Sequence, residues 1–170
     1  MKDHPLARGL DALYLACIWS AGLAIFLMSL IIPFGVFTRY VLGTGSQWPE
    51  PIAILLMMVF TFIGAAATYR AGAHIAVSML TDQLPPRLQR AMALLVHGLM
   101  LLVCGFVLWY GTRLCLETMG QSIAELPWLP VGVTYAAIPI GAGVTLLFVA
   151  EHLLLGSQAE RKVVAYEANH

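Results

Sequence analysis

Apolar residues fall into four long runs that polar segments separate. Charges are almost absent from these runs, and the apolar positions do not alternate with polar ones as they do in the strands of a membrane barrel. About 20 helical residues cross the roughly 30 Å of hydrocarbon in a bilayer, and each run is close to that length. The pattern predicts an all-α integral membrane protein with four transmembrane helices, at Leu13–Val36, Ile52–Tyr69, Ala91–Thr112 and Val131–Ala150.

The basic residues outside these runs are distributed unevenly. Seven lie in the N-terminal segment, the second loop and the C-terminal segment, whereas the first and third loops hold two. Because cytoplasmic segments of membrane proteins carry an excess of Lys and Arg, this distribution predicts that both termini are cytoplasmic. The seven are Lys2, Arg8, Arg70, Arg87, Arg90, Arg161 and Lys162, and the two are Arg39 and Arg113.

The composition favours a lipid environment. Of the 170 residues 60% are hydrophobic and 11% are charged, with a mean hydropathy of +0.83, whereas soluble domains carry about 25% charged residues. The formal net charge of zero gives no basic surplus for binding nucleic acid. The first apolar run is too long for a cleaved signal peptide, so we expect it to stay as a span. We interpret residues 1–170 as a single membrane domain.

The sequence offers few candidates for catalysis or cofactor binding. It contains no phosphate-binding loop, dinucleotide-binding glycine motif or metal-spaced cluster of His and Cys, so it predicts neither an enzyme nor a cofactor. His97 is the one ionisable residue that we place inside a predicted span, and such residues are functional candidates. His74 and His152 are expected at a similar depth, which leaves open a haem-binding redox anchor using His97 with His74 or His152. The alternative is a set of interfacial histidines with a hydrogen-bonded His97.

Two loops carry patterns of their own. Arg70 and His74 stand four residues apart, a spacing that places both on one face of a short helix lying on the inner membrane surface. Arg70 taken alone can equally be a basic anchor at that surface. The third loop, residues 113–130, either extends the third span or forms a short interfacial helix with Trp128 at headgroup depth.

Small residues gather near the end of the second span and within the fourth. In lipid, helices associate through close packing, and small side chains allow that approach. We therefore expect helix-packing seams at Gly64, Ala65, Ala66 and Gly141.

Short motifs occur along the chain in an order typical of one transporter family. "RY" at residues 39–40 follows the first span, and "WPE" at residues 48–50 precedes the second. Then come "GAA" at 64–66, Arg70, "HI" at 74–75, "LPPRLQR" at 84–90 and "YAAIPIG" at 135–141. Their order and spacing resemble the small membrane subunit of tripartite ATP-independent periplasmic (TRAP) transporters. The chain departs from that pattern at Pro51 and Ser78, where the family often has acidic residues.

The resemblance implies a function within a complex. In such transporters a periplasmic binding protein delivers a substrate, usually a carboxylate, to a large membrane subunit that imports it with sodium. The small subunit braces the large one, and the sodium and substrate sites lie in the large one. The resemblance thus implies an accessory subunit in the bacterial inner membrane that contacts the large subunit, the binding protein and lipids. The expected docking residues are Arg39, Tyr40, Trp48, Glu50, Arg70 and His74.

The segment Arg39–Pro51 has more than one interpretation. Arg39 and Glu50 can pair with each other, with the large subunit or with the binding protein. From the residues alone, a solvated turn with aromatic anchors explains the segment equally well, because Trp and Tyr are common at membrane interfaces.

Overall fold

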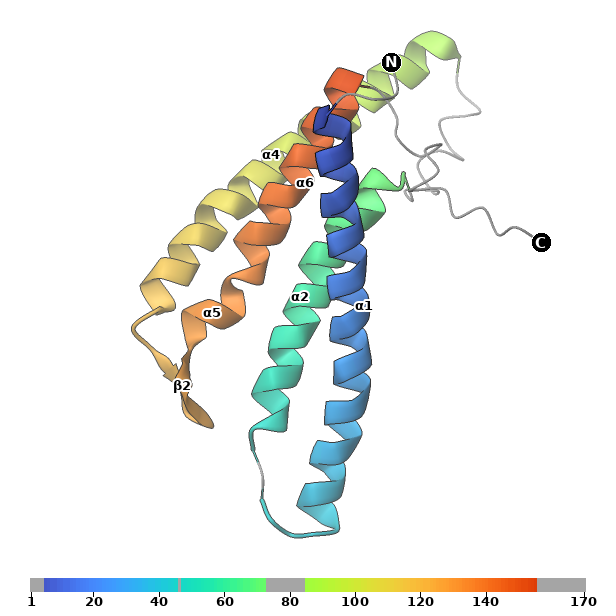
Figure 1. Ribbon diagram of the computed structural model, residues 1–170. Coiled ribbons are helices and arrows are strands. Elements are labelled where there is room, and N and C mark those ends of the chain that lie inside the picture. The colour runs from blue at the N-terminus through green and yellow to red at the C-terminus, as the bar shows by residue number, and fades with distance from the viewer. Residues whose placement is uncertain (1–4, 46, 73–84, 156–170) are drawn as a thin grey trace, which may run out of the picture.

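The computed structural model describes residues 5–45, 47–72 and 85–155 (Figure 1). Its elements are α1 (Pro5–Tyr40), α2 (Pro49–Arg70), α4 (Pro86–Thr118), β1 (Ser122–Ile123), β2 (Leu126–Pro130), α5 (Val131–Tyr135) and α6 (Ala137–Leu155). Four segments are long and apolar enough to cross a membrane, namely Arg8–Tyr40, Pro49–Arg70, Leu94–Thr118 and Val131–Leu154. The prediction of an all-α integral membrane protein with four spans is confirmed.

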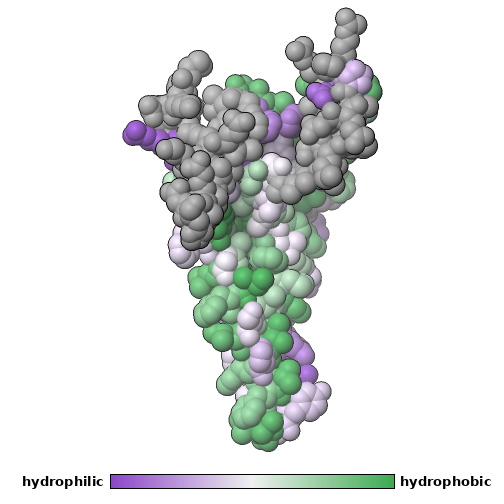
Figure 2. Space-filling model, turned by 90° about the vertical axis from the view of Figure 1, so that its right-hand side faces the viewer, coloured by the Kyte–Doolittle hydropathy of each residue, from purple (hydrophilic) through white to green (hydrophobic). Residues whose placement is uncertain are grey.

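The long helices form an open row rather than a closed bundle. α1 packs on α2, α2 on α6, and α6 on α4, whereas among the described residues the edge helices α1 and α4 share no extended contact (Figure 1). In the most apolar window of each span, 39% of the residues are buried in the last span but only 6% in α4. Figure 2 shows the resulting hydrophobic surface over the middle of the molecule. Such a surface is stable in lipid and not in water.

The two ends of the row differ. The start of α1, the end of α2 and the end of α6 lie together at one end, here called the termini end (Figure 1). The opposite, hairpin end holds residues 41–45, 47 and 48 and the antiparallel pair β1–β2, and the pairs α1–α2 and α4–α6 diverge toward it (Figure 1). The main buried cluster joins α1, α2 and α6 and consists of Tyr14, Cys17, Ala66, Ala67, Tyr69, Phe148 and Val149.

Residues 113–130 contain a helix extension and a β-hairpin. α4 continues to Thr118, as one of the two alternatives predicted. The other alternative, an interfacial helix around Trp128, is wrong, because Leu126–Pro130 is extended. Pro127 and Pro130 lack amide N–H groups and disfavour a helical conformation in the residues before them. The short helix predicted around His74 lies outside the described residues.

Three of the four small residues predicted to pack helices lie at helix contacts. Ala66 is fully buried, and a Cβ added to Gly64 would meet α1 at 3.7 Å. Gly141 makes the tightest approach of the three, since a Cβ there would lie 2.7 Å from the carbonyl oxygen of Phe62 in α2. Ala65, in contrast, is exposed. The contact of α2 with α6 therefore requires glycine at position 141.

Replacing Gly141 by Ala should destabilise the protein by about 1–3 kcal/mol, because the added methyl group meets backbone atoms that cannot rotate away. The matched control is Gly105→Ala in α4, where the added Cβ would meet no other described helix within 4 Å. That change should leave stability unchanged or raise it, since Ala favours helices over Gly. Denaturant unfolding in mild detergent, followed by circular dichroism, measures both. Equal stability of the two variants would contradict the tight α2–α6 contact.

Candidate functional site

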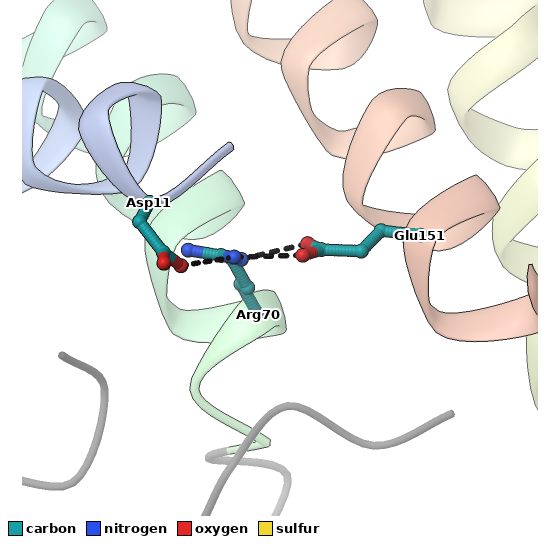
Figure 3. A network of polar contacts seen from close by, with 3 residues as sticks. All are labelled: Asp11, Arg70 and Glu151. Atoms are coloured by element: carbon teal, nitrogen blue, oxygen red, sulfur yellow. Dashed lines mark hydrogen bonds and ion pairs between the residues drawn. The ribbon is translucent and has the colours of Figure 1, made fainter. Parts of the chain in front are cut away.

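Arg70 is the last residue of α2, and its side chain points between α1 and α6 at the termini end (Figure 3). Its Nε and Nη2 each donate a hydrogen bond of 2.7 Å to a carboxylate oxygen of Glu151 in α6. Nη2 also donates to Asp11 Oδ1 in α1, again at 2.7 Å. One guanidinium thus joins helices whose contacting residues are 59 and 81 positions away in the sequence.

The ion pairs of Arg70 are shielded from solvent. The side chain of Arg70 is 1% exposed, that of Glu151 0% and that of Asp11 15%. The rings of Tyr14 and Phe148 lie 5.3 and 5.2 Å from the guanidinium carbon and add cation–π contacts. A buried charge is costly unless it is paired and hydrogen-bonded, and the two-pronged contact with Glu151 is the favourable geometry for such a pair. Arg70 Nη1 is also buried and has no hydrogen-bond partner among the residues that the structure describes.

A second polar group lies beside the first and includes the remaining helix. The Tyr69 hydroxyl is hydrogen-bonded to His97 Nδ1 of α4 at 2.9 Å. The rings of His97 and His152 are in contact, with centroids 4.7 Å apart. Since Tyr69 precedes Arg70 and His152 follows Glu151, the two groups form one level of the structure. We call the set Asp11, Tyr69, Arg70, His97, Glu151 and His152 the polar layer; it has members on α1, α2, α4 and α6.

The geometry does not favour a haem between His97 and His152. Two axial histidines must leave space for iron and porphyrin between their coordinating nitrogens. Here the two rings contact each other, and one nitrogen of His97 already has a hydrogen bond from or to Tyr69. The hydrogen-bonded His97 agrees with the simpler alternative. His74, the other ligand considered, lies outside the described residues.

Neither carboxylate of the polar layer was predicted from the sequence. The prediction that His97 is the one ionisable residue inside a span is wrong, because the last span continues past residue 150 and includes Glu151. The signal was available, since a carboxylate next to twenty residues without a charge is costly in lipid and needs a partner. Asp11 lies within the first span as the structure has it. Arg70, which we weighed as a surface anchor, is bound inside its own chain.

The other predicted docking residues lie at the hairpin end. Arg39 and Glu50 form an ion pair of 3.1 Å across the turn, with side chains 40% and 67% exposed. The structure thus contains the pairing within the chain that was one of the alternatives. The Trp48 ring lies 6.0 Å from that of Phe34 and is tilted against it, while Tyr40 is 78% exposed.

Comparison with known proteins places the chain in a family. The family model for the DctQ component of tripartite ATP-independent periplasmic transporters matches residues 28–159. The chain belongs to this family. A TRAP transporter small permease protein of Haemophilus influenzae is 29% identical over 65% of this chain and 68% of that protein.

Two further relatives carry substrate names. The ectoine TRAP transporter small permease protein TeaB of Halomonas elongata is 27% identical over 85% of this chain and 74% of TeaB. The sialic acid TRAP transporter small permease protein SiaQ of Vibrio cholerae is 23% identical over 69% of this chain and 67% of SiaQ. The resemblance that the motifs indicated is thus confirmed.

Membership of the DctQ family gives the polar layer its context. The chain is a multi-pass small permease subunit of a TRAP transporter, and the family is one of transporter components, not enzymes. A large permease and a substrate-binding protein are the partners that the family implies. In such a subunit the polar layer is suited to fixing helix positions, because its charges are paired with one another inside the chain.

Replacing Arg70 by Gln should destabilise the chain by about 3–5 kcal/mol, because it leaves Glu151 buried without its cation. Arg39→Gln is the matched control; its ion pair is exposed, so the loss should be about 1 kcal/mol or less. Denaturant unfolding in the same detergent compares the two variants.

A triple variant separates the charge from the packing. Asp11→Leu, Arg70→Met and Glu151→Leu together remove all three charges and keep approximately the same volume. This variant should recover most of the stability that Arg70→Gln loses, because no buried charge is left unpaired. If Arg70→Gln and Arg39→Gln lower the free energy of unfolding by the same amount, the polar layer does not hold the helices together.

Proposed function

We propose that this chain is the accessory subunit that braces the large transport subunit of a sodium-coupled importer of carboxylates. The observation that carries the proposal is the open row of helices in a chain of the DctQ family. Its edge helix α4 has almost no buried residues in its most apolar window. A helix that packs so little on its own chain has a wide face for a second membrane protein as well as for lipid.

The distribution of polar groups favours a bracing function and argues against a transport pathway through this chain. Ionisable residues that mark an ion or substrate route line the interior at membrane depth. Among the described residues the buried ion pairs are confined to the termini end, where Arg70 binds Asp11 and Glu151, and the Arg39–Glu50 pair at the other end is exposed. We therefore assign the sodium and substrate sites to the large subunit.

The proposed substrate class rests on the relatives. One relative is named for ectoine and another for sialic acid, and both compounds carry a carboxylate group. We infer a carboxylate that a periplasmic binding protein delivers to the complex.

We infer an orientation in the inner membrane from the basic residues. Among the described residues, Arg8, Arg70, Arg87 and Arg90 lie toward the termini end, whereas Arg39 and Arg113 lie toward the hairpin end; this excess favours the cytoplasm for the termini end. The hairpin end then faces the periplasm, on the side where a binding protein docks. On this assignment Arg39, Tyr40, Trp48 and Glu50 are the docking candidates.

Arg70 contributes to the complex in a different way from the docking candidates Arg39 and Glu50. Because its guanidinium is bound within the chain, we propose that it presents the correct arrangement of helices to the large subunit instead of contacting it. His74 remains a docking candidate from the motif alone.

Co-purification and reconstituted uptake test the assignment. The tagged chain, extracted from its native membrane in mild detergent, should carry a large polytopic protein in stoichiometric amount. Proteoliposomes with both subunits and the binding protein should take up substrate only with an inward sodium gradient. Uptake by this chain without the large subunit would exclude a bracing function.

Variants of the Arg39–Glu50 pair separate docking from local stability. Glu50→Ala and Arg39→Ala should each reduce uptake severalfold while the inserted amount of the chain stays the same. The exchange Arg39→Glu with Glu50→Arg restores the internal pair but reverses both charges toward a partner, so uptake should stay low. Glu125→Ala, an exposed carboxylate at the same end, is the control. Full uptake by the exchange variant would contradict the docking function and would show that the Arg39–Glu50 pair only stabilises the turn.

A further inference from the structure

A groove runs along α4 beside α6 in the half of the row nearer the hairpin end. Its volume is about 530 Å³. Four apolar residues form its wall, namely Phe106, Val107, Leu114 and Ile138. All four lie within the candidate spans, and Phe106 and Val107 are farthest from the end of the α4 span, at the depth of the hydrocarbon.

Polar residues border the same groove toward the hairpin end. Tyr110, Arg113 and Glu117 line it, and the spacing from Phe106 places all of them along one face of α4. At a rise of about 1.5 Å per residue, Phe106 lies about 18 Å from the end of the span, Arg113 about 7.5 Å and Glu117 about 1.5 Å. The two charged residues thus lie on the headgroup side of Phe106 and Val107, and Leu114 lies at the level of Arg113.

Arg113 and Glu117 are both available to a ligand. Their spacing permits an ion pair, yet among the described residues neither takes part in one, and both are exposed. Arg39 at the same end differs, because it is already paired with Glu50. A cation and an anion one helical turn apart are complementary in charge to a headgroup that carries a phosphate and an ammonium.

We propose that this groove binds one phospholipid of the phosphatidylethanolamine type. Arg113 binds the phosphate, and Glu117 accepts hydrogen bonds from the ammonium. An acyl chain lies against Phe106, Val107 and Ile138. Tyr110 stands between the two depths, where its hydroxyl can donate to a glycerol ester oxygen while its ring contacts the chain. The proposal does not depend on the part that the subunit has in transport.

Lipid retention by the full-length chain tests the proposal. The chain is placed in nanodiscs of equal parts phosphatidylethanolamine and phosphatidylglycerol, released, and weighed by native mass spectrometry. One phosphatidylethanolamine should stay bound, in preference to phosphatidylglycerol, which has no ammonium. Arg113→Gln should lower retention of both lipids about tenfold, the loss expected for one charge-assisted hydrogen bond. Glu117→Gln should keep lipid bound but remove the preference.

Arg39→Gln is the matched control, because it removes a basic residue at the same end without touching the groove; retention should be unchanged. Circular dichroism checks that each variant is folded. Equal retention of both lipids by the unaltered chain, or the same loss in Arg39→Gln as in Arg113→Gln, would overturn the proposal. The measurement is repeated on the complex with the large subunit. A complex that retains no lipid, and that fails to assemble with Arg113→Gln, would assign the groove to a protein contact and refute lipid binding.

Discussion

The arrangement of the helices depends on one guanidinium that is held between two carboxylates at the edge of a lipid environment. The guanidinium of Arg70 stays positively charged, because arginine does not lose its proton in proteins. It therefore needs acceptors wherever α2 places it, and Asp11 and Glu151 supply them from α1 and α6. In a membrane the hydrophobic effect contributes little driving force for helix association. A buried ion cluster whose charges are paired is a directional contact that lipid cannot replace.

The polar layer and the glycine contact act on the same pair of helices at different depths. Gly141 brings α6 against Phe62 of α2, and Glu151 binds Arg70 nearer the termini end. Two contacts along one helix pair fix both the separation and the rotation of α6 relative to α2. The hairpin end has no comparable polar layer among the described residues, and there the two helix pairs diverge (Figure 1). The row is thus held firmly at one end and open at the other.

The parts of this structure that were predictable depend on local patterns. The four spans follow from hydropathy because each is long and nearly free of charge, and the Arg39–Glu50 pair follows from its two ends meeting across a short turn. The order of the helices in the row was not predictable, since spans that are apolar on all sides do not indicate which face packs. The partners of Arg70 were missed for a related reason: they lie 59 and 81 positions away, and no spacing rule reaches so far. The prolines at 127 and 130 did carry a local signal for the β-hairpin, which the expectation of an interfacial helix overlooked.

The distances in sequence between the members of the ion cluster have a consequence for biogenesis. Asp11 and Arg70 lie on the first helix pair, so their charges can neutralise each other as soon as that pair is inserted. Glu151 is synthesised only near the end of the last helix, after the second helix has already supplied its hydrogen-bond donors on Arg70. A chain that is truncated before residue 151 lacks the two-pronged contact, and one that inserts its last helix incorrectly leaves a bare carboxylate in lipid. Completion of the cluster is thus a chemical signature of a fully inserted chain.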